Sequence, residues 1–180
     1  MSDSVPNVRL VMARQHWAEV PECSLPAGFS VRWYRPGDEA CWRKIHLAAE
    51  REVAITPELF RQQFGTNEAL LTRRQCYVLN ARGEAVGTAT AWFDEHFQGG
   101  DWGRVHWLAV MPDYQGQGLG RALLSLVCRR LQELGHTRAF LRTTATRLRA
   151  IKLYRAFGFV PLPQSEQERR LWDMLAPRLR

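Results

Sequence analysis

One stretch constrains this chain more than any other: an apolar segment, a glycine-rich loop and an amphipathic helix pattern follow one another from residue 105 to residue 134. The apolar segment reads VHWLAV, and Gly116, Gly118 and Gly120 follow it at alternate positions. Because glycine has no Cβ, a bound anion can approach its backbone closely. The unpaired N–H groups and the dipole at a helix start add positive potential there. The stretch therefore predicts a strand–loop–helix unit that binds a phosphate-bearing cofactor.

Three phosphate-binding patterns compete for this loop. A P-loop ends in Gly-Lys-Ser/Thr, whereas Arg121 and Ala122 follow Gly120 here. A dinucleotide fingerprint needs G-x-G-x-x-G early in a βαβ unit, whereas this loop reads G-x-G-x-G and lies late in the chain. The third pattern, Gln/Arg-x-x-Gly-x-Gly/Ala, is met by Gln115, Gly118 and Gly120. The structural alternative is a glycine-rich turn that merely joins strand to helix.

A second motif, RLRAIKLYRAFGF, occupies residues 147–159. Its apolar residues recur at helical spacing, Gly158 is placed to end the helix, and Phe159-Val160 resume as a strand. One helix and one strand, at 139–143, separate it from the glycine loop. The order and the sequences of the two motifs resemble the GCN5-related N-acetyltransferases over roughly residues 29–160. The family pattern A-x-x-L-Y-x-x-x-G-F is matched by Ala150, Leu153, Tyr154, Gly158 and Phe159.

The resemblance implies a cofactor site for acetyl-CoA, which would serve as the acyl donor. Backbone groups of Leu108, Ala109 and Val110 would bind the pantetheine arm and polarise the thioester carbonyl. Backbone N–H groups of the loop would hold the pyrophosphate, and the residues concerned are Gln115, Gly116, Gln117, Gly118, Leu119, Gly120 and Arg121. Tyr154 would contact the cofactor and donate a proton to the departing thiolate. The alternative for Tyr154 is a core tyrosine on an apolar helix face.

Two positions depart from the family pattern. Arg147 stands where the family often has an asparagine that contacts the cofactor, and Arg104 stands where many members have a glutamate base. His106 is our candidate base, because a histidine titrates near neutral pH. Strand alternation predicts that Arg104, His106 and Leu108 share one face unless a bulge shifts the register. A hydrogen-bonded core histidine is an equal alternative.

Charge is unevenly distributed along the chain. Residues 1–103 hold 11 Lys and Arg against 13 Asp and Glu, whereas residues 104–180 hold 14 against 5. The basic half carries the glycine loop and would attract an anionic cofactor. Asp94, Glu95, His96 and Asp101 precede the central strand and could bind a cationic amine acceptor or serve as the base. The alternative for each of them is an exposed polar loop. Nucleic acid ranks lower as a partner, because we find no zinc-finger, RNP or zipper signature.

The composition is that of an ordinary globular protein, and the order of the expected strands and helices is mixed α/β. We expect an N-terminal extension without an assigned role at 1–28 and a single domain at 29–180. The expected strands are 29–34, 76–79, 85–93, 105–110, 139–143 and 159–160, and the expected helices are 39–50, 56–64, 122–134, 147–157 and 165–175. The resemblance implies the acyl-CoA N-acyltransferase fold, with a mixed, mostly antiparallel central sheet flanked by helices. Six aromatic residues either line the acceptor site or fill the core: Trp33, Trp42, Trp92, Phe93, Phe97 and Trp102.

The four cysteines, Cys23, Cys41, Cys76 and Cys128, are scattered, with no CxxC pair and no zinc-type histidine spacing. We therefore expect no metal and a reduced, cytoplasmic setting. We see no signal peptide and no apolar run of membrane length. The oligomeric state stays open, a homodimer included.

Together these features predict an N-acetyltransferase that moves an acetyl group directly from acetyl-CoA to a primary amine. The acceptor itself is not readable from the sequence. The alternative is a non-catalytic CoA-binding or nucleic-acid-associated module on the same fold.

Overall fold

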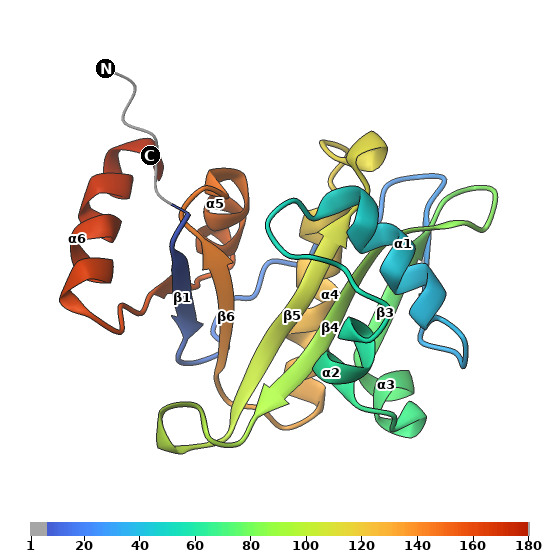
Figure 1. The fold of residues 1–180 in the computed structure, drawn as a ribbon, viewed down its shortest axis with the longest axis horizontal. Helices are drawn as coiled ribbons and strands as arrows, with labels where there is room; N and C mark the ends of the chain where they lie inside the picture. The colour runs from blue at the N-terminus through green and yellow to red at the C-terminus, as the bar shows by residue number, and fades with distance from the viewer. Residues whose placement is uncertain (1–6, 180) are drawn as a thin grey trace.

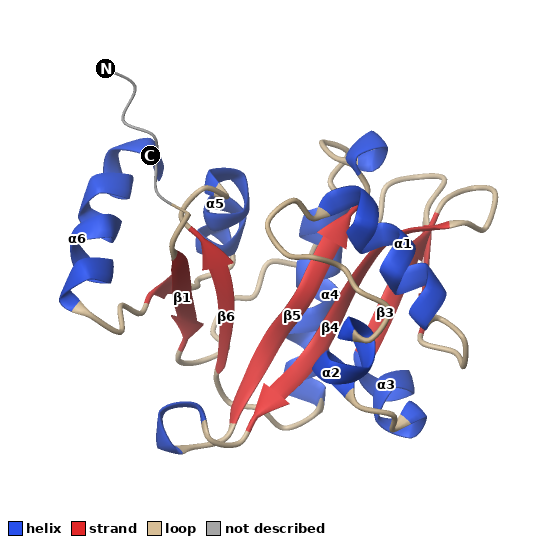
Figure 2. Ribbon diagram, in the orientation of Figure 1, coloured by secondary structure: helices blue, strands red, loops and turns tan. Residues whose placement is uncertain are grey.

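The computed structural model describes residues 7–179, which form one seven-stranded sheet with helices on both faces (Figures 1 and 2). The spatial strand order is β2-β3-β4-β5-β6-β1-β7. The strands are β1 (Arg9–Arg14), β2 (Ser30–Trp33), β3 (Gln75–Leu79), β4 (Ala85–Asp94), β5 (Trp102–Val110), β6 (Ala139–Thr144) and β7 (Val160–Pro161). The helices are α1 (Glu39–Ala49), α2 (Leu59–Phe64), α3 (Glu68–Arg74), α4 (Leu119–Glu133), α5 (Leu148–Ala156) and α6 (Glu166–Leu175).

The sheet is mixed and mostly antiparallel, as the sequence predicts. Its one parallel pair joins β5 to β6, and the register aligns Gly103–Val105 with Ala139–Leu141. Beyond Val105 and Leu141 no further pairing joins the two strands within residues 7–179. Figure 1 shows them separating toward their carboxyl ends. We call this opening the split, and it determines where the site lies.

A β-bulge interrupts β5 just past the last paired residue. Thr90 of β4 lies opposite His106 and Thr88 lies opposite Ala109, so Trp107 and Leu108 together face the single residue between them. Trp107 adopts a φ of +50°, which only a local distortion of the strand produces. The bulge makes simple alternation wrong here, because Leu108 packs with the core beside α4 while the His106 ring contacts Phe64 of α2.

Residues 9–14, which the sequence leaves without a role, form strand β1 between β6 and β7. Leu10 and Met12 of this strand are fully buried in the main core. This part of the expected extension therefore shares the sheet with the rest of the chain. The first six residues of that extension lie outside the described residues, and the division at residue 28 stays a prediction.

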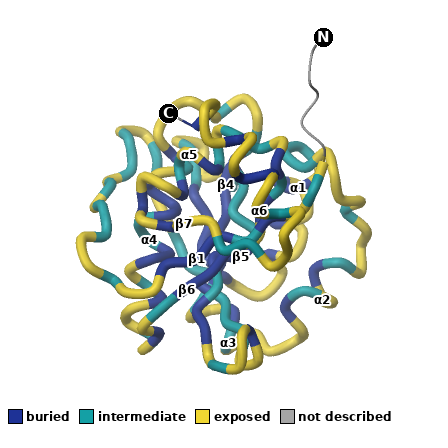
Figure 3. The backbone as a smooth tube through the Cα atoms, turned by 90° about the vertical axis from the view of Figure 1, so that its left-hand side faces the viewer, coloured by how far each residue is buried: buried dark blue, intermediate teal, exposed yellow. Residues whose placement is uncertain are grey.

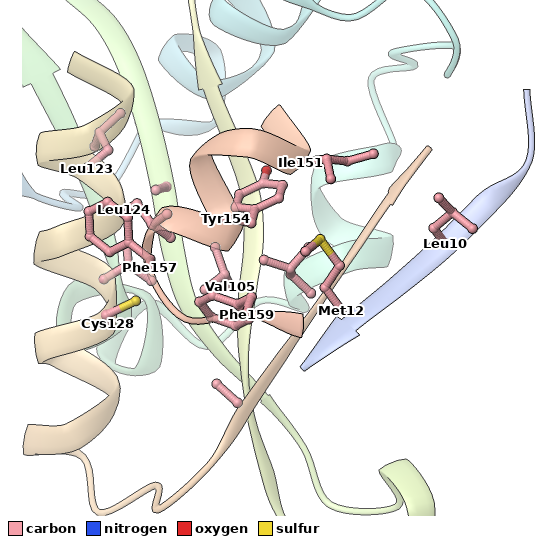
Figure 4. Close-up of a cluster of buried hydrophobic side chains, with 14 of the residues drawn as sticks. Leu10, Met12, Val105, Leu123, Leu124, Cys128, Ile151, Tyr154, Phe157 and Phe159 are labelled. Carbon is pink, nitrogen blue, oxygen red and sulfur yellow. The ribbon is translucent and has the colours of Figure 1, made fainter. Parts of the chain in front are cut away.

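Two large apolar clusters occupy opposite faces of the sheet. Buried residues concentrate along the strands, where the clusters pack against the sheet (Figure 3). One contains α4 and α5 side chains against β1, β5 and β6, part of which is drawn in Figure 4. The other is aromatic and lies under α1 and α2, where Trp42, Phe60, Phe64 and Tyr77 are buried. Trp42, Phe97 and Trp102 are thus core residues, and Trp33 and Trp92 are partly buried against the cores.

The helices depart from the sequence prediction chiefly at α2 and α3. Helix α2 begins at Leu59 rather than at Thr56. Helix α3 is unpredicted, although Asn67 caps it by accepting the Leu70 N–H at 3.0 Å. The tail forms the expected helix α6, and the Ser165 hydroxyl accepts the Glu168 N–H at its start.

Candidate functional site

The glycine loop connects the end of β5 to the start of α4 at the mouth of the split. Gly116 and Gly118 have φ values of +78° and +87°, which non-glycine residues rarely adopt. Gly118 is the N-cap of α4, and its carbonyl accepts the N–H groups of Arg121 and Ala122. None of the amides of residues 116–120 donates to a protein acceptor within residues 7–179. A row of free amides at a helix start is suited to bind an anion.

Gly120 has a different role from the two glycines before it. Its backbone is helical, and a Cβ added there would meet only the Leu153 Cδ2 atom, at an ordinary 3.5 Å. Loop conformation therefore requires glycine at 116 and 118 but not at 120. The same short distance shows that α5 packs directly on the start of α4. The two motifs recognised in the sequence thus meet in space.

The polar side chains of the loop serve mainly to fix its shape. Gln115 Nε2 donates to the Val110 carbonyl at 2.9 Å and so ties the loop to the end of β5. The side chain of Gln117 is exposed and lies 3.4 Å from the Asp113 carbonyl. Arg121 is exposed on the first turn of α4 and lies 5.9 Å from the Phe157 ring centroid. Anion binding at this loop would depend on its backbone, with Arg121 adding positive charge.

Tyr154 comes from the middle of α5 and lies on the same face of the sheet as α4. Its ring is buried beside Val105 and Phe159 (Figure 4). The ring centroids of Tyr154 and Phe159 are 6.4 Å apart. Burial raises the pKa of its hydroxyl, and the nearby charge of Arg147 opposes that rise. The hydroxyl is therefore protonated at neutral pH and can act as a donor.

Leu108, Ala109 and Val110 complete β5 between the bulge and the glycine loop. On one side Ala109 and Val110 pair with Thr88 and Gly87 of β4. On the other side these residues face the split, where no strand pairs with them among the described residues. Their backbone groups on that edge are placed to bind an extended ligand between β5 and β6.

His106 lies on the opposite face of the sheet from Tyr154, among the aromatic side chains beneath α2. It is only 5% exposed, and its Nε2 has no hydrogen-bond partner in the described part of the chain. Burial, followed by the charges of Arg104 and Arg142, holds its pKa well below 6.5. The imidazole is therefore neutral at neutral pH.

A second buried histidine packs on the same face of the sheet as His106. The ring of His46 in α1 is tilted against Trp42 and meets Trp107 edge-on, with ring centroids 4.3 and 4.9 Å away. Burial lowers its pKa to about 4, and its Nε2 also lacks a partner within residues 7–179. The helical spacing of Trp42, Ile45 and His46 was an available signal, because residues three and four apart share a helix face.

Charged residues near the site differ from those expected. The loop with Asp94, Glu95 and Asp101 precedes β5, whereas the glycine loop follows it, so the two loops lie at opposite ends of the strand. The structure therefore does not bring this acidic loop to the split. Instead, Arg147 lies there and pairs with Glu50, which follows α1.

The described residues contain no group of three or more side chains that could hold a metal ion. No helix among residues 7–179 is long and apolar enough to cross a membrane.

Comparison with known families gives a match to the acetyltransferase (GNAT) family over residues 32–159. Among curated proteins, the chain is 34% identical over 155 residues to the mycothiol acetyltransferase of Pseudarthrobacter chlorophenolicus, covering 79% of this chain and 46% of that protein. It is 31% identical over 145 residues to the mycothiol acetyltransferase of Streptomyces coelicolor, with the same coverage. The chain thus spans about half the length of the curated relatives it matches.

Solved structures share the fold at lower identity. A GCN5-related N-acetyltransferase from Sphaerobacter thermophilus superposes with a TM-score of 0.67 at 23% identity, covering 86% of this chain and 48% of that one. The ribosomal-protein-S18-alanine N-acetyltransferase from Escherichia coli gives 0.61 at 24% identity, covering 75% and 79%. These likenesses confirm the fold predicted from the two motifs.

Proposed function

Because this chain belongs to the acetyltransferase (GNAT) family, we propose that it transfers an acetyl group from acetyl-CoA directly to a primary amine. One observation carries this proposal: the free amides of residues 116–120 lie beside the split between β5 and β6, with Tyr154 on the adjoining helix. That arrangement combines a site for a phosphate-bearing donor with a buried proton donor.

Acetyl-CoA would bind with its phosphates at the glycine loop and its thioester in the split. The left-handed backbone of Gly116 and Gly118 turns the amides of the loop outward, and the start of α4 adds its dipole. The unpaired edge of Leu108, Ala109 and Val110 would hold the pantetheine arm by backbone hydrogen bonds. An N–H group directed at the thioester carbonyl would stabilise the oxyanion that develops there.

Two protons must move during the transfer. The amine attacks the thioester carbon, a C–N bond forms, and the C–S bond breaks to release CoA as a thiolate. Tyr154 would give its proton to that thiolate, which is consistent with a hydroxyl whose pKa is raised by burial. His106 would take the proton of the amine, directly or through water. Its buried, unpartnered Nε2 and its neutral state at neutral pH support this role.

The alternative is a module that binds CoA on this fold without catalysis. Incubation of the protein with acetyl-CoA and a panel of small amines and N-terminal peptides separates the two. We expect an acetylated amine, detected by mass spectrometry, and an equal amount of free CoA thiol. Calorimetric CoA binding without acetylation of any amine would favour the alternative. Absence of both binding and transfer would contradict both.

A further inference from the structure

Arg147 joins two segments that are distant in the sequence. It stands immediately before α5, and its Nη2 lies 2.6 and 2.8 Å from the two carboxylate oxygens of Glu50. The same nitrogen is 3.1 Å from an oxygen of Glu52. The guanidinium therefore bridges the segment that follows α1 to the segment that follows β6.

Two threonine hydroxyls reinforce this bridge. Thr144 and Thr146 donate to the Glu52 carboxylate at 2.9 and 2.6 Å. The Glu50 carboxylate also accepts the backbone N–H groups of Arg51 and Glu52, both at 2.8 Å, which shapes the loop itself. We call this set of side chains the clasp; it consists of Glu50, Glu52, Thr144, Thr146 and Arg147.

The clasp spans the split. On one side, His46 lies one helical turn before Glu50 and rests against Trp107 at the bulge of β5. On the other side, Thr144 is the last residue of β6. Figure 1 shows the segment between α1 and α2 swinging toward α5 and then crossing the face of β5 and β4. The clasp therefore holds this segment across the strands where they separate.

The clasp is charged at neutral pH and is unevenly shielded from water, since Glu52 and Thr146 are exposed residues. The Glu50 side chain is only 6% exposed. Burial opposes its ionisation, but backbone N–H groups and Arg147 hold its pKa below the ordinary range. The pKa of Arg147 is raised by Glu50 despite partial burial. A partly buried ion pair leaves an uncompensated charge when one partner is removed.

We propose that Arg147 is a positioning residue, which holds the α1–α2 segment over the split so that the segment forms one wall of the amine-acceptor site. This inference rests on the proposed acetyl transfer. Between the clasp and Ile55, which packs against the aromatic core, Val53 and Ala54 are exposed. These two residues are placed to border the acceptor.

This role differs from the cofactor contact that the family resemblance associates with position 147. The Nη2 atom is engaged by two carboxylates, so its charge is already balanced within the protein. The Arg147 charge also lowers the pKa of both Tyr154 and His46, although burial dominates the shift of each group.

The test compares Arg147→Ala with Arg149→Ala, a matched control that removes an exposed arginine from the same helix start. Limited trypsin cleavage after Arg51 reports on the loop independently of activity. In Arg147→Ala we expect that cleavage to accelerate by about tenfold, and KM for the amine to rise by about tenfold, while the dissociation constant of acetyl-CoA stays within about twofold. Arg149→Ala should match the wild type, and Arg147→Lys should restore part of both effects because it keeps the charge.

Equal cleavage rates and equal amine KM values in the two alanine variants would overturn the clasp. So would weaker acetyl-CoA binding with unchanged cleavage, which would make Arg147 a cofactor contact. If Arg147→Ala does not fold, Glu52→Gln replaces it, with the same two readouts expected to move. If the wild type acetylates no amine, the proposed function fails, whereas the cleavage comparison still tests whether the clasp holds the loop.

Discussion

The two faces of the sheet at the split are built in different ways. On the α4 and α5 face, the glycine loop and Tyr154 come from two short segments whose motifs are each continuous in sequence. On the α1 and α2 face, His46, Glu50 and His106 come from three separate elements or loops, and Glu50 pairs with Arg147 from the start of α5. The first face offers mostly backbone groups, whereas the second offers side chains.

The difference explains why the proposed donor site is easier to predict from the sequence than the proposed acceptor site. Backbone amides are common to all residues, so a loop that binds through them needs only the right local conformation, which glycine signals. A site made of side chains depends on long-range packing and has no fixed spacing. If the two faces act separately, a substitution on one face should change donor binding or turnover without changing the properties that depend on the other face.

The largest effect should come from a carboxylate at the anion site. In Gly120→Asp, the added charge lies in the first turn of α4, where it repels a pyrophosphate but does not oppose the helix dipole. We expect acetyl-CoA affinity, measured by calorimetry, to fall by about 100-fold or more, since binding there is electrostatic. Gly120→Ala is the matched control, because its methyl group meets only Leu153 at 3.5 Å. Equal acetyl-CoA affinities in the two variants would show that the loop is not the anion-binding site.

Loss of the Tyr154 hydroxyl should affect turnover and spare donor binding. We expect Tyr154→Phe to lower kcat by about 100-fold, the scale of a lost general acid. Tyr34→Phe is the control, because it also removes a buried hydroxyl, one without a partner in the described residues. A Tyr154→Phe enzyme with wild-type kcat, when chemistry is rate-limiting, would exclude this residue as the proton donor.

His106 should shape the pH dependence of the reaction. A base must be unprotonated, so kcat/KM rises as pH increases through its pKa. Because burial and Arg104 hold the pKa of His106 below 6.5, we expect this limb on the acid side of 6.5. His106→Gln should abolish the limb and lower kcat/KM by about tenfold or more. His46→Gln distinguishes the two histidines: if it removes the limb and His106→Gln does not, the base lies on α1.

The smallest effect should be on stability at acid pH. Glu50 and Glu52 have pKa values held below their ordinary range, so their stabilisation is complete above the unfolded-state pKa and is lost as pH falls through the folded-state values. We expect Glu50→Gln to lower Tm at neutral pH by about 3 °C for each kcal/mol of unfolding free energy that is lost. The difference in Tm between this variant and the wild type should become smaller as the pH is lowered. Glu95→Gln, on an exposed loop, should leave Tm unchanged at both pH values. A constant difference across pH would show that Glu50 stabilises the fold without its charge.

Several structural features could be predicted because they depend on neighbours in sequence. The start of α4 follows from glycine conformation, and the end of α5 at Gly158, with a φ of +76°, follows from the same preference. The strand-and-helix order from residue 29 onward also follows, since apolar periodicity is local. Helix α3 could have been predicted from Asn67, which is a favoured residue type for a helix N-cap. Asp38 immediately precedes α1, but its carboxylate binds Arg32 at 2.5 Å and does not cap the helix, which only the folded structure reveals.

By itself the sequence determined the proposed donor side of this protein: the glycine loop, the helix it opens and the Tyr154 helix, with their order along the chain. Only the tertiary structure decided the face on which Leu108 lies, the place of β1 in the sheet and the partners of Arg147. The bulge at Trp107 depends on the pairing of β5 with β4, and the clasp joins residues more than 90 positions apart. Such contacts form only once the sheet has assembled, so no local pattern encodes them.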